Sequence, residues 1–120
     1  MKLLGDRLLL ARLIFGADAV LGVGTIAAAA LYGAALSTGS AKATFAGTFV
    51  PLAALWVLFC RLAYAGLTSE RLALKILFWA HVVGHFFALP VGTLIAGTSV
   101  WIWRDLRNQR LASRHEVSSR

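Results

Sequence analysis

Two histidines, His81 and His85, have the side chains best placed to do chemistry in this chain, because they lie in a strongly apolar setting. The run Ile76–Trp103 around them contains no Asp, Glu, Lys or Arg. Ionisable residues inside such a run are rare, and each is a candidate functional residue. Since residues four apart lie on one face of a helix, both imidazoles are expected to project from the same side.

The imidazole pair could bind a haem or a chlorophyll-type pigment, hold a metal ion, or make structural hydrogen bonds. A bis-histidine haem needs ligands from two facing helices, whereas a pigment needs one axial histidine beside small residues such as Gly84 and Ala88. No zinc site is expected, because no glutamate lies between the histidines and a third ligand would have to come from elsewhere. The favoured interpretation is a hydrogen bond to a neighbouring helix or subunit, typically worth about 0.6 kcal/mol. If a cofactor is bound, His85 is the better candidate ligand, because His81 has candidate protein partners.

A second candidate group is an intramembrane polar cluster of Asp18, Arg61 and His81, expected on three different helices. Asp18 follows Arg12 by six residues and His81 follows Lys75 by six, which puts each about 9 Å along its helix from the preceding charge. Arg61 ends an apolar run on the same side. The structural interpretation is an ion pair that lowers the cost of charge in a membrane. The functional interpretation is a proton- or ion-linked carboxylate in a small transporter.

The elements that must position these residues are expected to be membrane-spanning helices. The chain has 120 residues, of which 59% are hydrophobic, and a mean hydropathy of +0.76. A soluble domain of this size cannot bury so much apolar surface. The net charge of +7 could suggest nucleic acid, but the basic residues bracket the apolar runs, as topology determinants and anionic-lipid contacts do. No nucleic-acid partner is therefore expected.

Apolar runs and helix-stop signals predict an all-α integral membrane fold in a single transmembrane domain, residues 1–107. Pro90 and Gly92 interrupt the last apolar run, because proline removes a backbone donor and glycine permits a turn. The last two helices are therefore expected to form a hairpin broken at Pro90–Gly92. The four expected spans are residues 13–36, 45–66, 69–89 and 90–107. A polar basic tail, residues 108–120, is expected to be flexible.

The distribution of positive charge separates this layout from an alternative with three spans and one long, kinked third helix. With three spans, six basic residues lie on each side of the membrane. With four spans, eleven lie on one side and only Lys42 on the other. The positive-inside rule favours the second layout, which puts both termini in the cytoplasm. Trp101 and Trp103 beside Arg104 also fit an aromatic belt at that interface.

A stripe of small residues, Ala80, Gly84 and Ala88, continues every fourth residue through Gly92 and Ala96. Such a stripe usually lines a close helix–helix contact on one continuous helix, which would favour three spans. In a chain rich in alanine and glycine this spacing often arises by chance, so the charge count decides for four helices. Ala80, Gly84 and Ala88 are expected to be helix-packing residues.

The segment Leu89–Gly97 (LPVGTLIAG) resembles a feature of small uncharacterised bacterial multi-span membrane proteins. Those proteins carry a Pro-x-Gly-Thr break between their last two hydrophobic segments. The resemblance covers about the last 45 residues of the chain. It implies the hairpin topology and carries no activity with it.

No catalytic set emerges from the sequence: there is no nucleophile beside a base, no glycine-rich phosphate loop with a lysine, and no pair of carboxylates. Enzyme activity is therefore not expected. The expected function is a structural or accessory subunit of a larger complex of the bacterial cytoplasmic (inner) membrane, such as a bioenergetic or photosynthetic one. Its expected partners are membrane lipids and other membrane subunits or a second copy. The alternatives are a haem- or pigment-binding membrane protein using His81 or His85, and a small oligomeric proton-coupled transporter using Asp18.

Overall fold

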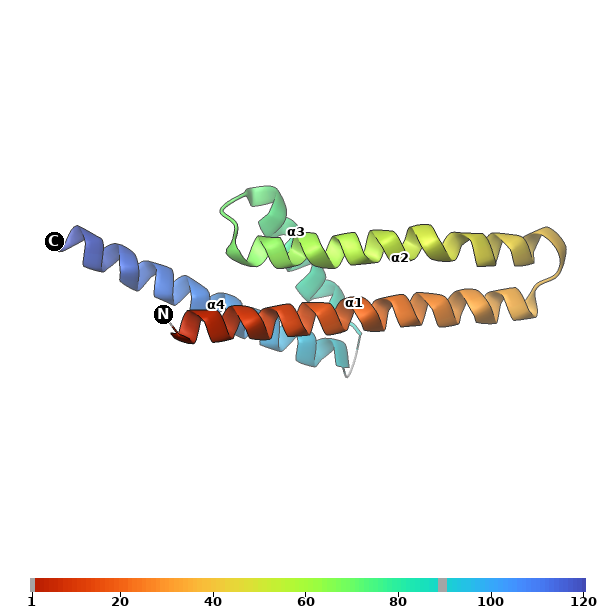
Figure 1. The fold of residues 1–120 in the computed structure, drawn as a ribbon, viewed down its shortest axis with the longest axis horizontal. Coiled ribbons are helices and arrows are strands. Elements are labelled where there is room, and N and C mark those ends of the chain that lie inside the picture. Colours follow the sequence, from red (N-terminus) through yellow and green to blue (C-terminus); the bar gives the residue numbers. More distant parts are fainter. Residues whose placement is uncertain (1, 89–90) are drawn as a thin grey trace. The chain divides into compact units, whose positions relative to one another are not determined.

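The computed structural model describes residues 2–88 and 91–120, with side chains from residue 4 onward in the first helix. In this part the chain is helical and contains no strand (Figure 1). The expected all-α class is confirmed. The helices are α1 (Lys2–Leu36), α2 (Gly39–Thr68), α3 (Leu72–Phe86) and α4 (Val91–Ser118).

The two long helices α1 and α2 begin earlier than the expected spans, at Lys2 and Gly39 in place of residues 13 and 45. Hydropathy marks only the apolar part of a helix, whereas alanine, leucine, arginine and lysine propagate a helix beyond it. The two helices are separated by a short turn. Gly39 there has a φ of +58°, a left-handed conformation that glycine adopts without steric cost.

Helix α3 is shorter than expected. The backbone of Arg71 is extended, with φ −70° and ψ 125°, and its N–H donates a hydrogen bond to Ser69 Oγ at 3.1 Å, which holds the turn before the helix. The helix ends at Phe86, so it has 15 residues in place of the expected span 69–89. Fifteen residues rise about 22 Å, less than the hydrocarbon thickness of about 30 Å.

Helices α3 and α4 are separate and pack against each other. The rings of Trp79 and Trp103 lie 5.2 Å apart at an interplanar angle of 72°. On one continuous helix these residues would be about 36 Å apart, so the chain reverses direction between them. The expected break is therefore present, and the alternative of a single long third helix is not observed. Pro90 itself lies outside the described residues.

Helix α4 continues past the expected end of the fourth span at residue 107. The helix reaches Ser118, so most of the segment 108–120, expected as a tail, is helical. Its side chains from Leu111 onward are exposed. This segment includes Arg110, Leu111, Ala112 and Arg114, which favour helix even where no core is available.

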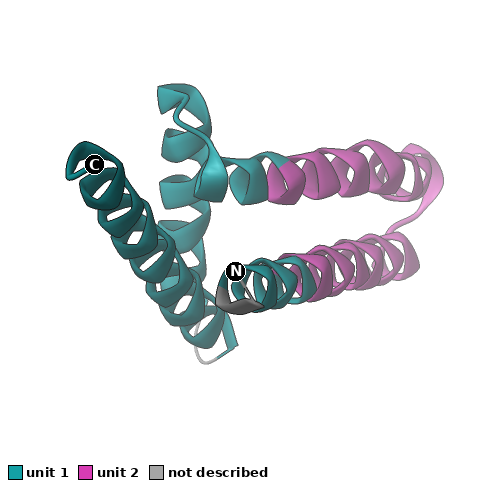
Figure 2. Ribbon diagram, turned by 60° about the vertical axis from the view of Figure 1, so that its left-hand side comes forward, with its two compact units in different colours: residues 1–14, 62–120 teal, residues 15–61 magenta. Residues whose placement is uncertain are grey.

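The chain divides into two compact units (Figure 2). Unit 2, residues 15–61, contains the second half of α1, the turn after it and α2 as far as Arg61, and the two helices run side by side in opposite directions. Gly22 of α1 lies against the indole of Trp56, and Gly33 lies against the ring of Phe45. The α1 position advances by eleven residues while the α2 position retreats by eleven, as an antiparallel register requires.

Unit 1, residues 1–14 and 62–120, contains the first turns of α1, the end of α2, and all of α3 and α4. Phe78 of α3 and Ile102 of α4 are fully buried. The α1 segment is tied to α4 by Arg7, whose Nε lies 3.0 Å from the Asp105 carboxylate and whose guanidinium lies 3.9 Å from the Trp101 ring centroid.

Helices α1 and α2 are long and apolar enough to cross a membrane, with a mean hydropathy of 1.9 for each. The apolar windows of the two helices are 0% and 6% buried within the chain. A soluble core helix would have most of this surface covered by its own chain. Most of the apolar surface of α1 and α2 is therefore not covered by the described part of the chain.

Candidate functional site

The two candidate histidines lie on α3 and are both buried, with exposed fractions of 1% for His81 and 8% for His85. Their ring centroids are 4.1 Å apart and the ring planes are tilted by 34°. Nδ1 of His85 lies 2.9 Å from the backbone carbonyl oxygen of His81. A carbonyl only accepts, so Nδ1 carries the proton and, in a neutral ring, the lone pair is on Nε2. This is the tautomer that an axial metal ligand uses.

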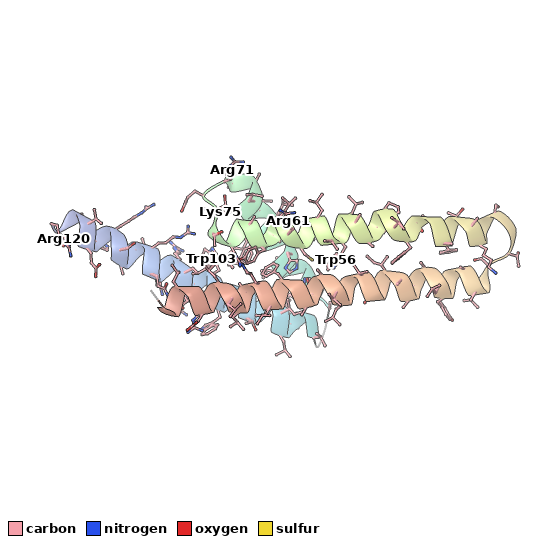
Figure 3. All side chains as sticks on the ribbon, viewed as in Figure 1. Trp56, Arg61, Arg71, Lys75, Trp103 and Arg120 are labelled. Atoms are coloured by element: carbon pink, nitrogen blue, oxygen red, sulfur yellow. The ribbon has the colours of Figure 1, made fainter. Side chains whose placement is uncertain are left out.

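Asp18 lies in unit 2 and is buried, with an exposed fraction of 4%. The thiol of Cys60 donates a hydrogen bond to Asp18 Oδ2 at 3.5 Å, and Nε1 of Trp56 donates to the Asp18 backbone carbonyl at 3.4 Å. Arg61, the expected neighbour of Asp18, is on the exposed surface of α2 (Figure 3). His81, the third residue of the expected cluster, belongs to unit 1. Cys60 was not expected as a partner of Asp18, because it is adjacent only through the antiparallel register.

The small residues expected to pack helices together, Ala80, Gly84 and Ala88, are exposed. A methyl group built on Gly84 meets no atom within 4 Å in the described part of the chain. Gly92, by contrast, is buried at the start of α4, and a methyl group there would overlap the His85 carbonyl. Gly92 thus allows close packing at the α3–α4 break, whereas no described residue covers the stripe on α3.

The feature that sequence reasoning missed is a cleft in unit 1 of about 300 Å³, here called the basic cleft. It lies where the end of α2 and the following turn meet the start of α3 and the middle of α4. One part of its lining is charged and another is aromatic or aliphatic. The lining residues are Gly66, Leu67, Ser69, Glu70, Lys75, Trp79, Trp103, Leu106, Arg107, Arg110, Leu111 and Arg114.

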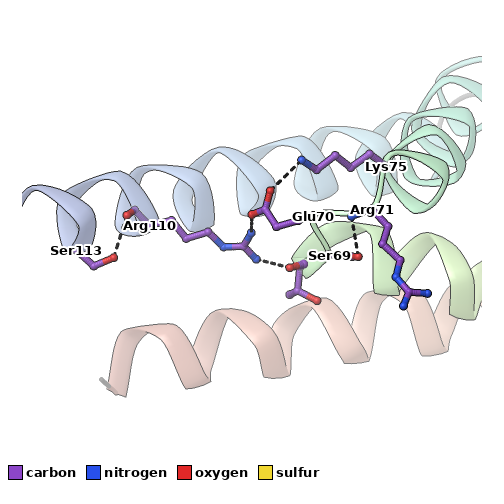
Figure 4. Close-up of polar contacts among 7 residues, drawn as sticks. Ser69, Glu70, Arg71, Lys75, Arg110 and Ser113 are labelled. Carbon is purple, nitrogen blue, oxygen red and sulfur yellow. Dashed lines mark hydrogen bonds and ion pairs between the residues drawn. The ribbon is translucent and has the colours of Figure 1, made fainter. Parts of the chain in front are cut away.

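Glu70 organises the charged part of the basic cleft. One carboxylate oxygen lies 3.3 Å from Lys75 Nζ, and the other lies 2.8 Å from Arg110 Nη1 (Figure 4). Arg110 also donates to the backbone carbonyl of Thr68. The pKa of Glu70 is lowered, first by the hydrogen bond and charge of Lys75 and then by Arg110. The carboxylate is therefore ionised at neutral pH, and both ion pairs are present.

The aromatic part of the cleft is formed by Trp79 and Trp103, whose rings meet edge to face. The guanidinium of Arg107 lies 5.4 Å from the Trp103 ring centroid, within cation–π range. In the charged part of the cleft Lys75 comes from α3, and in the aromatic part Trp103 comes from α4 (Figure 3). A sequence signal for the cleft does exist. On both helices of the expected hairpin, a tryptophan lies within a few residues of a basic side chain: Trp79 follows Lys75, and Trp103 precedes Arg107.

Comparison of the chain with protein-family models, with curated proteins and with solved structures finds no match. The resemblance of Leu89–Gly97 to bacterial multi-span proteins therefore stays a prediction. Function has to be inferred from the geometry of the chain itself.

Proposed function

We propose that this chain is an integral membrane protein that serves as a structural or accessory subunit of a larger complex in the bacterial cytoplasmic membrane. The observation that carries this proposal is the uncovered apolar surface of α1 and α2, whose windows are 0% and 6% buried. Lipid or neighbouring subunits must cover such a surface, because large exposed apolar areas cause aggregation in water.

The proposed topology puts both termini on the cytoplasmic side. In unit 1 the contact between Arg7 and Asp105 supports it, since it joins the start of α1 to the polar part of α4. If α1 and α2 cross the membrane, α3 begins on the cytoplasmic side. The α3–α4 hairpin then brings the chain back to that side, both when the hairpin spans the bilayer and when it enters the bilayer only part of the way. Eleven basic residues then share that side, as the positive-inside rule favours. The short α3 makes the dipping hairpin easier to accommodate than a full crossing.

The proposed docking surface for another subunit is the stripe of Ala80, Gly84 and Ala88 on α3. These residues are exposed in this chain, and small residues allow two membrane helices to approach closely. A bioenergetic or photosynthetic assembly is the kind of complex that such a chain suits, because these assemblies contain small helical subunits without catalytic residues.

The test is purification of the native chain in mild detergent, followed by native mass spectrometry. We expect a defined species larger than the monomer, and we expect Gly84→Leu to reduce its yield at least severalfold by blocking the approach of a partner helix. The matched control is Gly97→Leu in α4, where a methyl group also meets no atom within 4 Å of the described chain. A lone monomer for the native chain, or equal effects of both variants, would contradict the proposal.

A second candidate function is haem or pigment binding through His85. The contact between His85 Nδ1 and the His81 carbonyl favours it, because it leaves the lone pair on Nε2, where an axial bond forms. The expected result is a Soret or Qy absorption band in the purified protein that His85→Leu abolishes and His115→Leu, in the exposed end of α4, leaves intact. The absence of any such band in the native protein would rule this function out.

A further inference from the structure

We propose that the basic cleft binds the phosphate group of an anionic phospholipid in the cytoplasmic leaflet. This inference rests on the proposed membrane function, because it requires the cleft to face the lipid headgroups. The cleft is formed entirely by residues of unit 1.

The charge of the lining selects an anion. Four cationic side chains line the cleft, Lys75, Arg107, Arg110 and Arg114, against the single carboxylate of Glu70. The charged side chains of the lining therefore carry a net charge of +3. Glu70 pairs with Lys75 and Arg110, so it fixes two of the cations in place. Arg107 and Arg114 then supply the positive charge that an incoming phosphate would meet.

The aromatic and aliphatic part of the lining selects an amphipathic ligand. Trp79, Trp103 and Leu111 line the same cleft as the arginines. Tryptophan is enriched at the depth of the headgroups, where one end of the ring is apolar and the other is wet. A soluble phosphate would gain nothing from these side chains, whereas the glycerol and upper acyl carbons of a lipid would contact them. A volume of about 300 Å³ suits a phosphodiester headgroup.

The position of the cleft along both helices agrees with a lipid ligand. On α3 the last charge before the apolar segment is Lys75, and on α4 the first charges after it are Arg104 and Asp105. Both boundaries adjoin the cleft, through Lys75 and Trp79 on α3 and Trp103 and Leu106 on α4. Anionic lipids attract basic side chains at this depth, within a Debye length of the surface.

The experiment measures lipid binding to the purified full chain in neutral detergent by native mass spectrometry. Phosphatidylglycerol is titrated against phosphatidylcholine, with inorganic phosphate as competitor. We expect the native chain to bind phosphatidylglycerol at least fivefold more tightly than phosphatidylcholine. The double variant Arg107→Gln/Arg114→Gln is expected to weaken phosphatidylglycerol binding about ten- to thirtyfold. Arg114→Gln alone is expected to cause roughly half of that effect on a logarithmic scale.

The matched control is Arg104→Gln/Arg120→Gln, which removes the same net charge from α4 and the C-terminus without touching the cleft. We expect it to bind phosphatidylglycerol within twofold of the native chain. Equal weakening by both double variants would overturn the inference, because the effect would then be diffuse surface charge. Full displacement of lipid by millimolar phosphate would overturn it as well, since the site would then take any small anion.

Membrane insertion is measured separately, by flotation of the chain with phosphatidylcholine vesicles. An inserted chain stays with the vesicles after alkaline extraction. A chain that inserts but shows no preference for phosphatidylglycerol contradicts the lipid site alone. A chain that does not insert contradicts the proposed membrane function. The two failures are therefore distinguishable.

Discussion

Replacing Gly66 with alanine is expected to destabilise the folded chain by about 1–3 kcal/mol, the range for adding a methyl group to a packed site. Gly66 is buried near the end of α2, and a methyl group there would overlap the backbone carbonyl of Leu74 and crowd Cβ of Phe78. A backbone carbonyl cannot rotate away as a side chain can. Helix α3 must therefore shift, even though alanine by itself favours a helix by about 0.5–1 kcal/mol over glycine.

The measurement is thermal unfolding of the purified chain in detergent, followed by circular dichroism. The control is Gly47→Ala in the same helix, where a methyl group meets no atom within 4 Å in the described part of the chain. We expect Gly47→Ala to leave the melting temperature unchanged or slightly raised, and Gly66→Ala to lower it by several degrees. A Gly66→Ala variant as stable as Gly47→Ala would show that α2 and α3 do not pack as described.

The Gly66 substitution also connects stability to the basic cleft. Gly66 lines the cleft, and Lys75 follows Leu74 directly on α3. A shift of α3 would therefore move Lys75 away from Glu70, whose oxygen it approaches to 3.3 Å. We expect Gly66→Ala to lose both stability and lipid binding, whereas the cleft variants at Arg107 and Arg114 should lose lipid binding alone.

Replacing Gly22 with alanine is expected to open the α1–α2 pair in unit 2 and expose the thiol of Cys60. A methyl group at Gly22 would overlap the indole of Trp56, which donates a hydrogen bond to the Asp18 carbonyl. Displacing this large ring also disturbs Cys60, which lies one turn further along α2 and has an exposed fraction of 2%. An overpacking cost of about 1.4 kcal/mol corresponds to a tenfold change in the local opening equilibrium.

The rate of maleimide labelling measures this opening directly, because Cys60 is the single cysteine of the chain. We expect labelling of Gly22→Ala to be on the order of tenfold faster than that of the native chain. Gly24→Ala is the control, since its methyl group meets no atom within 4 Å in the described residues. If the two variants label at the native rate, Trp56 is not held between Gly22 and Asp18 as the structure has it.

The helical class and the break between α3 and α4 could be predicted from the sequence because they depend on local properties. Long apolar runs without charge favour helix, and Pro90 and Gly92 predict an interruption of the last of them. Gly92 itself lies inside α4, as its second residue. The helix ends were less accurate. Hydropathy reports only where the apolar segment begins and stops. Helix α1 begins earlier, at Lys2, and α4 ends later, at Ser118, because their polar flanks also propagate a helix.

For the candidate polar residues, too, the local spacing was predictable and the tertiary neighbours were not. The spacing of His81 and His85 predicted one shared helical face, and both lie buried on α3. The expected neighbourhood of Asp18 and Arg61 was inferred from similar depth alone. Depth along a helix says nothing about rotation around its axis, and in the structure Asp18 is buried while Arg61 is exposed. The thiol of Cys60 takes the position next to the carboxylate.

The sequence by itself determined an apolar, helical chain with its basic residues at the ends of the apolar runs, since composition and local spacing settle these properties. Only the tertiary structure decided which residues act together. Glu70 and Lys75 are close in sequence, but Arg110 comes from forty positions further on. Gly22 and Gly66 face another helix, whereas a methyl group at Gly24 or Gly47 meets no described atom within 4 Å, although all four look alike in the sequence. The physical reason is that packing depends on the rotation and register of helices against one another, which contacts distant in sequence determine.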